Sequence, residues 1–138
     1  MRTFDPKALK AAAIAVVGDL VCSDHCTAGS VSAALLTATG AVFTGICIDT
    51  QSSLGFCAEH AAIAEMLKHR QTRIVAIVAV DTRGTIRPPC GRCRELIRQV
   101  DAENWTTGVV VAEGSVVPLS ELLPFAVPTK KSNAAEAS

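Results

Sequence analysis

The sequence has no excess of either charge, since its 138 residues hold 13 Lys and Arg against 13 Asp and Glu. Nucleic-acid binding usually needs a net basic face, so this balance argues against a polynucleotide partner. No apolar run approaches the roughly 18 residues that a membrane span needs, which argues against a membrane protein. The opening MRTFDPKALK mixes charges and leads into a helical pattern, so we expect no secretory signal there.

Charged residues make up only 19% of the chain and apolar residues 49%, a composition that excludes a disordered polymer and predicts a packed core. The length is that of one domain, and no internal repeat is visible. Six cysteines stand out in a chain for which we expect no export signal. We therefore expect a cytoplasmic protein whose cysteines are thiols, metal ligands or catalytic groups rather than disulfides.

Helices and strands alternate along the sequence. Helical patterns cover residues 5–18, 57–70, 90–100 and 119–123, and strand patterns cover 31–37, 41–48, 73–80, 107–112 and 116–117. Residues 19–30 and 50–56 have no clear periodicity and are predicted as loops. We predict one α/β domain over residues 1–127, followed by a flexible tail at 128–138.

The order of these elements predicts a five-stranded mixed sheet with helices on both faces. Residues 41–112 follow a βαβαβ pattern, which implies right-handed crossovers and a partly parallel sheet. Only three residues, 113–115, separate the last two strands. A parallel crossover needs about a dozen residues, so the last strand is expected to run antiparallel to its predecessor.

Two short elements at predicted helix starts hold the strongest chemical signal, namely Cys57-Ala58-Glu59 and Pro89-Cys90-Gly91-Arg92-Cys93. Zinc prefers thiolate ligands, and a catalytic zinc site has three protein ligands and one position for water. Cys90 and Cys93 share one helix face, and Cys57 would add a third ligand. The positive ends of both helices favour thiolates.

Glu59 lies about 200° around the helix from Cys57, so we expect it to point away from the ligand direction and to be a poor ligand. A carboxylate beside a metal-bound water is suited to general acid/base work. The alternative is a structural zinc knuckle with four protein ligands, the fourth coming from His60 or from the cluster of Cys22, His25 and Cys26. That alternative leaves Glu59 unexplained.

Several segments resemble the cytidine deaminase family over nearly the whole chain, namely VSAALLTATGAVFTG, FCAEHAAI, PPCGRCREL and ELLP, and PCGRCR is also similar to blasticidin S deaminases. The resemblance implies a three-layer fold and a zinc-dependent hydrolytic deaminase. It implies one Zn²⁺ per chain on Cys57, Cys90 and Cys93, with Glu59 as the proton shuttle. It also implies a small cytosine-containing substrate, a role in pyrimidine salvage, and a homotetramer or a homodimer.

Family members that bind ribose have an Asn-x-Glu-Asn motif where this chain has Cys47-Ile48-Asp49-Thr50. Asp49 retains a carboxylate that can accept a sugar hydroxyl, whereas a thiol at Cys47 cannot replace an amide. Cys47 is therefore either a substrate contact or a small buried strand residue. Because blasticidin S deaminases also depart from the sugar motif, a cytosine-containing antibiotic is an alternative substrate. A non-catalytic zinc protein with the same fold is a weaker alternative.

Further positions follow from the resemblance. The backbone near Ala58 would hold the base, and Phe56 or Phe125 would stack on it, although a core role is the alternative for both aromatics. His60 replaces a family arginine that bonds ligand thiolates, and Arg94 is a second candidate for such a contact. Five arginines form a local basic run that we interpret as solvated charges or thiolate partners: Arg83, Arg87, Arg92, Arg94 and Arg98.

Overall fold

The computed structural model of the protein describes residues 2–127, and the predicted tail at 128–138 lies outside them. The helices are α1 (Pro6–Ile14), α2 (Ala58–Lys68), α3 (Gly91–Val100), the 3₁₀ helix η1 (Ala102–Thr106) and α4 (Leu119–Leu122). The strands are β1 (Leu20–Ser23), β2 (Cys26–Thr37), β3 (Val42–Thr50), β4 (Ile74–Asp81), β5 (Gly108–Ala112) and β6 (Ser115–Pro118). Within residues 2–127, no helix has the length and apolar character needed to cross a membrane.

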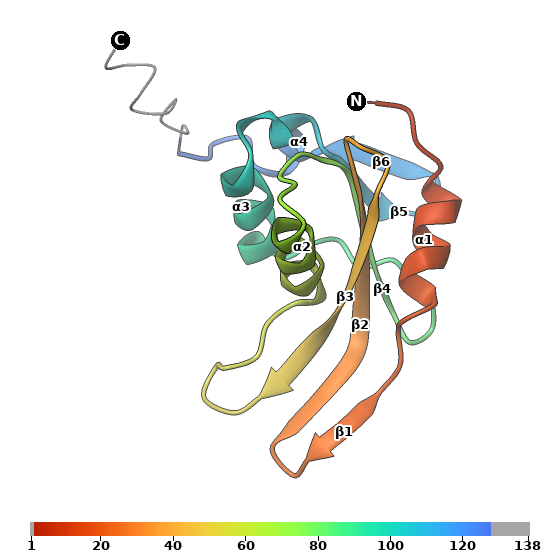
Figure 1. Ribbon diagram of the computed structural model, residues 1–138, viewed down its shortest axis with the longest axis vertical. Coiled ribbons are helices and arrows are strands. Elements are labelled where there is room, and N and C mark those ends of the chain that lie inside the picture. Colours follow the sequence, from red (N-terminus) through yellow and green to blue (C-terminus); the bar gives the residue numbers. More distant parts are fainter. Residues whose placement is uncertain (1, 128–138) are drawn as a thin grey trace.

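The strands form one mixed sheet, as expected, in which β2 pairs with β1, β3 and β4, and β5 connects β4 to β6 (Figure 1). β4 and β5 are parallel, and all other pairs are antiparallel. The prediction of an antiparallel last strand is therefore confirmed. The sheet has six strands rather than five because β1 was not expected.

The prediction of a loop over residues 19–30 was wrong. Leu20 and Val21 pair with Ala28 and Thr27, so this segment forms a β-hairpin that extends β2 at its start (Figure 1). Every residue of β1 is exposed, so the strand carries no alternation of buried and exposed side chains that a sequence pattern would reveal. α1 also ends at Ile14, four residues earlier than expected.

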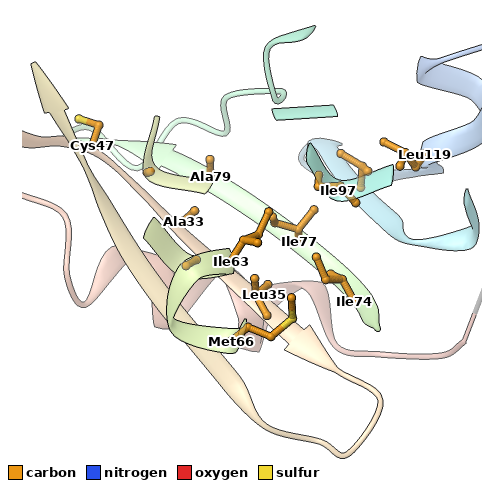
Figure 2. Packing of buried hydrophobic residues seen from close by; sticks show 13 residues of the cluster. Ala33, Leu35, Cys47, Ile63, Met66, Ile74, Ile77, Ala79, Ile97 and Leu119 are labelled. Atoms are coloured by element: carbon orange, nitrogen blue, oxygen red, sulfur yellow. The ribbon is translucent and has the colours of Figure 1, made fainter. Parts of the chain in front are cut away.

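Helices cover both faces of the sheet, which confirms the three-layer prediction. α1 packs on one face, where Leu9 and Ala13 contact Ala34, Val78 and other buried residues. α2, α3 and α4 cover the opposite face (Figure 1). Their core is shown in Figure 2 and holds the largest buried side chains of this layer: Leu35, Ile63, Met66, Ile74, Ile77, Ile97 and Leu119.

The absence of a side chain at Gly45 sets the distance between α2 and β3. A Cβ atom at Gly45 would lie 2.4 Å from the backbone nitrogen of Ala62 and 2.8 Å from the carbonyl oxygen of Ala58. Real Cβ contacts do not come this close, so only glycine lets the helix backbone lie directly on the strand. This contact places the start of α2 directly against β3.

The buried side chain of Asn104 in η1 joins α3 to β4. Its Oδ1 atom accepts the backbone N–H of Ile74 at 2.9 Å, and its Nδ2 atom donates to the carbonyl oxygens of Ile97 at 2.9 Å and Thr72 at 3.1 Å. Asn104 is fully buried, so these bonds are shielded from water. The end of α3 is thereby fixed against the strand that precedes it.

Candidate active site

Three thiols converge at the starts of α2 and α3. The Sγ atom of Cys90 lies 3.6 Å from that of Cys57 and 3.6 Å from that of Cys93, and all three lie within 4.8 Å of one another. A tetrahedral zinc site with Zn–S bonds of about 2.3 Å has sulfur atoms about 3.8 Å apart. The donor set and its spacing therefore fit one zinc ion held by Cys57, Cys90 and Cys93.

The local backbone explains why these thiols meet. Cys57 and Cys90 are the N-cap residues of α2 and α3, with extended backbones that turn their side chains toward the helix ends. Neither side chain makes a capping hydrogen bond, which leaves both sulfur atoms available as ligands. Cys93 lies in the first turn of α3 and is fully buried.

Burial raises the pKa of the Cys93 thiol, and the neighbouring carboxylate of Glu59 raises it further. Burial and a hydrogen bond with Cys90 also raise the pKa of Cys57. Burial acts in the same direction on Cys90, but hydrogen bonds from the backbone N–H of Cys93, from the neighbouring thiols and from the backbone N–H of Arg92 outweigh it and lower the pKa of Cys90. The raised pKa values of Cys57 and Cys93 favour their thiol forms when no metal is bound, and zinc would displace those protons.

Glu59 lies beside this cluster, and the prediction that it points away from the ligands was wrong. Glu59 is 5% exposed, and its Oε2 atom accepts a hydrogen bond from Cys93 Sγ at 3.3 Å. The angle of 200° assumed that Cys57 is helical, but Cys57 is an extended N-cap residue, so the helical period does not apply between the two. Among residues 2–127, the group whose ligand atoms all lie within 4.8 Å contains only the three cysteines.

Two further side chains lie near the thiols. The Nδ1 atom of His60 is 3.5 Å from Cys93 Sγ. Burial, together with the positive charge of Arg92, lowers the pKa of His60 and favours its neutral form. Arg94 instead donates to the carbonyl oxygens of Pro89 at 2.8 Å and Leu122 at 3.4 Å. It thus holds the backbone just before Cys90 and joins it to α4.

A cavity of about 480 Å³ opens beside the thiols. Cys57, Ala58, Glu59 and Cys90 line it from the helix starts, and Phe56 lines it from the loop before α2. The strands β2 and β3 add a second wall that includes Ser30, Cys47, Asp49 and Thr50. The loop before α3 adds Arg87 and Pro88, and the first turn of α3 adds Arg92. The cavity therefore joins the predicted metal site to the predicted sugar-binding positions.

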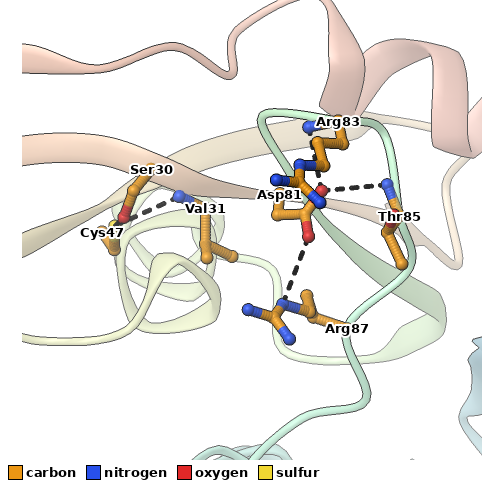
Figure 3. Close-up of polar contacts among 7 residues, drawn as sticks. All are labelled: Ser30, Val31, Cys47, Asp81, Arg83, Thr85 and Arg87. Carbon is orange, nitrogen blue, oxygen red and sulfur yellow. Dashed lines mark hydrogen bonds and ion pairs between the residues drawn. The ribbon is translucent and has the colours of Figure 1, made fainter.

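The second wall is itself hydrogen-bonded. Cys47 is buried, and its Sγ atom lies 3.3 Å from Ser30 Oγ and accepts the backbone N–H of Val31 at 3.3 Å (Figure 3). Ser30 also donates to Asp49 Oδ2 at 3.3 Å. Next to Asp49, the Oγ1 atom of Thr50 is buried and, within residues 2–127, lacks a hydrogen-bond partner.

Other predicted residues lie elsewhere. Phe125 is 98% exposed, so it neither lines this cavity nor belongs to the core of the chain. Cys22 and Cys26 lie on the β1–β2 hairpin rather than in a loop. Within residues 2–127, they form no three-residue metal cluster with His25. Ser30, Arg87 and Arg92 were not expected to line a cavity, because only the folded chain brings them to the same cavity as Glu59.

Comparisons with known proteins agree with this geometry. Residues 7–109 match the family model of the cytidine and deoxycytidylate deaminase zinc-binding region. A cytidine deaminase of Mycobacterium tuberculosis is 36% identical over 69 residues, which are 49% of this chain and 52% of that enzyme. The chain thus matches only about half the length of this relative. A cytidine deaminase of Halalkalibacterium halodurans is 33% identical over 107 residues, which are 75% of this chain and 80% of that enzyme.

Solved structures show the same fold. The crystal structure of cytidine deaminase from M. tuberculosis superposes with a TM-score of 0.77 at 28% identity and covers 91% of this chain and 99% of its own. That from Burkholderia pseudomallei has a TM-score of 0.70 at 31% identity and covers 90% of this chain and 100% of its own. With a matching three-thiol site and a family model that spans most of the chain, the protein belongs to the cytidine and deoxycytidylate deaminase family.

Proposed function

We propose that the protein is a zinc-dependent aminohydrolase that converts a cytosine nucleoside, cytidine or deoxycytidine, to its uracil form with release of ammonia. The observation that carries this proposal is the buried carboxylate of Glu59 beside three converging thiols, on the wall of a cavity of about 480 Å³. A structural zinc site has no need of such a carboxylate, so its position favours catalysis over a purely structural metal.

Zinc bound to the three thiolates would supply a Lewis acid and lower the pKa of a water molecule at its fourth position. Glu59 would then move protons in both directions. Its carboxylate would take one proton from the water and give it to N3 of the ring, and would then take the second proton from the new hydroxyl at C4 and give it to the exocyclic nitrogen. A C–O bond forms at C4, the bond from C4 to the amino nitrogen breaks, and ammonia leaves.

The other residues of the site would hold and orient these groups. His60 would donate a hydrogen bond to the Cys93 thiolate, and Arg94 would keep Cys90 in place through the carbonyl oxygen of Pro89. Phe56 lines the cavity and is the aromatic candidate for stacking on the base, with the backbone around Ala58 beside it.

The wall formed by β2 and β3 favours a departure from ordinary ribose recognition. Cys47 is engaged by Ser30 and by the backbone of Val31, so its sulfur does not replace the donor and acceptor of an amide. Asp49 is the carboxylate on this wall that can accept substrate hydroxyls. Because the amide that binds ribose is missing, blasticidin S or a related cytosine-containing antibiotic is a second candidate substrate.

A parallel assay on the zinc-loaded protein separates these candidates. Ammonia release and the loss of cytosine absorbance are followed with cytidine, deoxycytidine and blasticidin S at equal concentrations. Turnover of a nucleoside supports a role in nucleoside salvage, whereas turnover of blasticidin S alone supports a cytosine-containing antibiotic as the substrate. No turnover of any of them, with one zinc bound per chain, would refute the proposed activity and favour a non-catalytic zinc protein.

We further propose that the chain forms homotetramers, with homodimers as the alternative, and that it works in the cytoplasm. Phe125, Val127 and Leu54 are 98%, 74% and 78% exposed in the single chain, and such apolar side chains often mark contacts between subunits. All six cysteines are free thiols, which suits a reducing compartment. Sedimentation of the zinc-loaded protein measures the assembly, and a monomer at micromolar concentration would contradict it.

A further inference from the structure

The arginines near the active site differ in what they contact. Arg98 donates to Glu95, and Arg94 donates to backbone carbonyl oxygens. Arg83 is exposed and does not line the cavity. Arg87 and Arg92, in contrast, line the same cavity as Glu59. These two side chains were expected to be solvated charges or thiolate partners, and both are exposed, but their place in the cavity also brings them within reach of a bound substrate.

Arg87 is held in place by its own backbone and by Asp81. Its backbone N–H donates to the carbonyl oxygen of Ala79 at 2.9 Å, and its Nε atom lies 3.5 Å from Asp81 Oδ2 (Figure 3). The other carboxylate oxygen of Asp81 accepts the backbone N–H groups of Arg83 at 2.9 Å and Thr85 at 3.0 Å. These two backbone groups hold the Asp81 carboxylate, which then contacts the Arg87 guanidinium.

This ion pair uses only one side of the guanidinium group. Within residues 2–127, the two terminal nitrogens of Arg87 have no protein hydrogen-bond partner. A guanidinium presents such nitrogens in a planar fork that matches two oxygens of a phosphate or a carboxylate. Arg87, whose side chain is 60% exposed, is therefore tethered at Nε by Asp81 and has unused donors at the wall of the cavity.

Arg92 adds a second positive charge on the same side. It lies in the first turn of α3, where the helix dipole also favours negative charge, and its side chain makes no ion pair within residues 2–127. The carboxylate of Asp49 lies on the β2–β3 wall instead. The cavity thus has an acidic group on its strand wall, one cationic group on the loop that leads to α3 and a second in the first turn of α3.

We propose that Arg87 and Arg92 bind an anionic group carried by the substrate, a phosphate or a carboxylate attached to the sugar or sugar-like part of a cytosine compound. The proposal rests on the proposed deamination and narrows its substrate class. Hydroxyl groups of the substrate would face Asp49, and its anionic group would face the two arginines. Asp81 would act as a positioning residue that orients the Arg87 guanidinium.

The test compares kcat/KM of the zinc-loaded protein for cytidine, cytidine 5′-monophosphate and cytidine 5′-carboxylate. Hydrogen bonds to charged groups contribute enough for about a tenfold preference or more for an anionic compound over cytidine. The anionic compound with the higher kcat/KM shows whether the site prefers a phosphate or a carboxylate.

In Arg87→Gln, the ratio of kcat/KM for the anionic compound to kcat/KM for cytidine is expected to fall about tenfold. Arg83→Gln, on the same turn, is expected to leave this ratio unchanged. Cytidine preferred over both anionic compounds, or an unchanged ratio in Arg87→Gln, would overturn the proposal.

Product binding separates this proposal from the proposed activity. Calorimetry with uridine 5′-monophosphate and uridine needs no turnover, and we expect the monophosphate to bind about tenfold more tightly, with an advantage that falls at high salt and in Arg87→Gln. Such binding without any deamination would support the anion site and refute the proposed activity. Deamination of cytidine without any advantage for the monophosphate would overturn the anion site alone.

Discussion

Replacing Gly45 by alanine should push α2 away from β3. The new Cβ atom would lie 2.4 Å from the backbone nitrogen of Ala62, 2.6 Å from the Cβ atom of Ala61 and 2.8 Å from the carbonyl oxygen of Ala58. Two of these three atoms belong to the helix backbone, so no side-chain rotation relieves the clash. Relief requires α2 to move by about 1 Å, because ordinary contacts of this kind are about 3.5 Å long.

Overpacking of a core costs about 1–3 kcal/mol, and the rigid backbone on both sides places Gly45→Ala near the upper end, at about 3 kcal/mol. Urea denaturation of the zinc-loaded protein measures this loss. Because α2 carries Cys57 at its start, we also expect a chelator to remove zinc faster from the variant. Both effects have one cause and should appear together.

Gly91→Ala is the matched control, because a Cβ atom at Gly91 meets no atom within 4 Å and the residue begins a helix. We expect its stability to change by less than about 0.5 kcal/mol. A loss of stability in Gly45→Ala as small as that in the control would refute the claim that glycine sets the position of α2.

Two more predictions concern the core and the metal. Asn104→Ala would leave the backbone N–H of Ile74 and the carbonyl oxygen of Ile97 buried without partners, so we expect a loss of about 3 kcal/mol in urea denaturation, and a loss below 1 kcal/mol would contradict the role of Asn104. The raised pKa values of Cys57 and Cys93 mean that zinc binding must release protons, so affinity in a chelator competition should rise between about pH 6 and pH 8. A flat profile would contradict the protonated state of the two thiols.

Much of this fold is predictable from local patterns. The apolar run at residues 73–80 predicts a buried strand, which the structure has as β4 (Ile74–Asp81), and the short connection at 113–115 predicts that β6 is antiparallel. The β1 strand could not be found in this way, because its side chains are all exposed and no apolar pattern marks it. Only its pairing with the start of β2 makes it a strand.

The active site was predictable only in part. The spacing of Cys90 and Cys93 and their position at a helix start reveal a metal-binding pair, and the three thiols do meet. The direction of Glu59 was not predictable from helical geometry, because Cys57 is an N-cap residue with an extended backbone. The cavity role of Arg87 depends on the turn that Asp81 stabilises, and no sequence spacing reveals which nitrogens of a guanidinium stay unused.

The central claim is that Glu59 moves protons beside a zinc site built from three thiolates. The most direct measurement compares ammonia release from cytidine by the wild-type protein, Glu59→Gln and the control Glu65→Gln. Glu65 lies on the same helix, is half-buried and pairs with Lys68. Loss of a general acid and base costs about 10²–10⁴ in rate, so Glu59→Gln should lose at least a hundredfold in kcat while it keeps one zinc per chain. Glu65→Gln should stay within about twofold of the wild-type rate. Substantial activity in zinc-loaded Glu59→Gln would contradict the account.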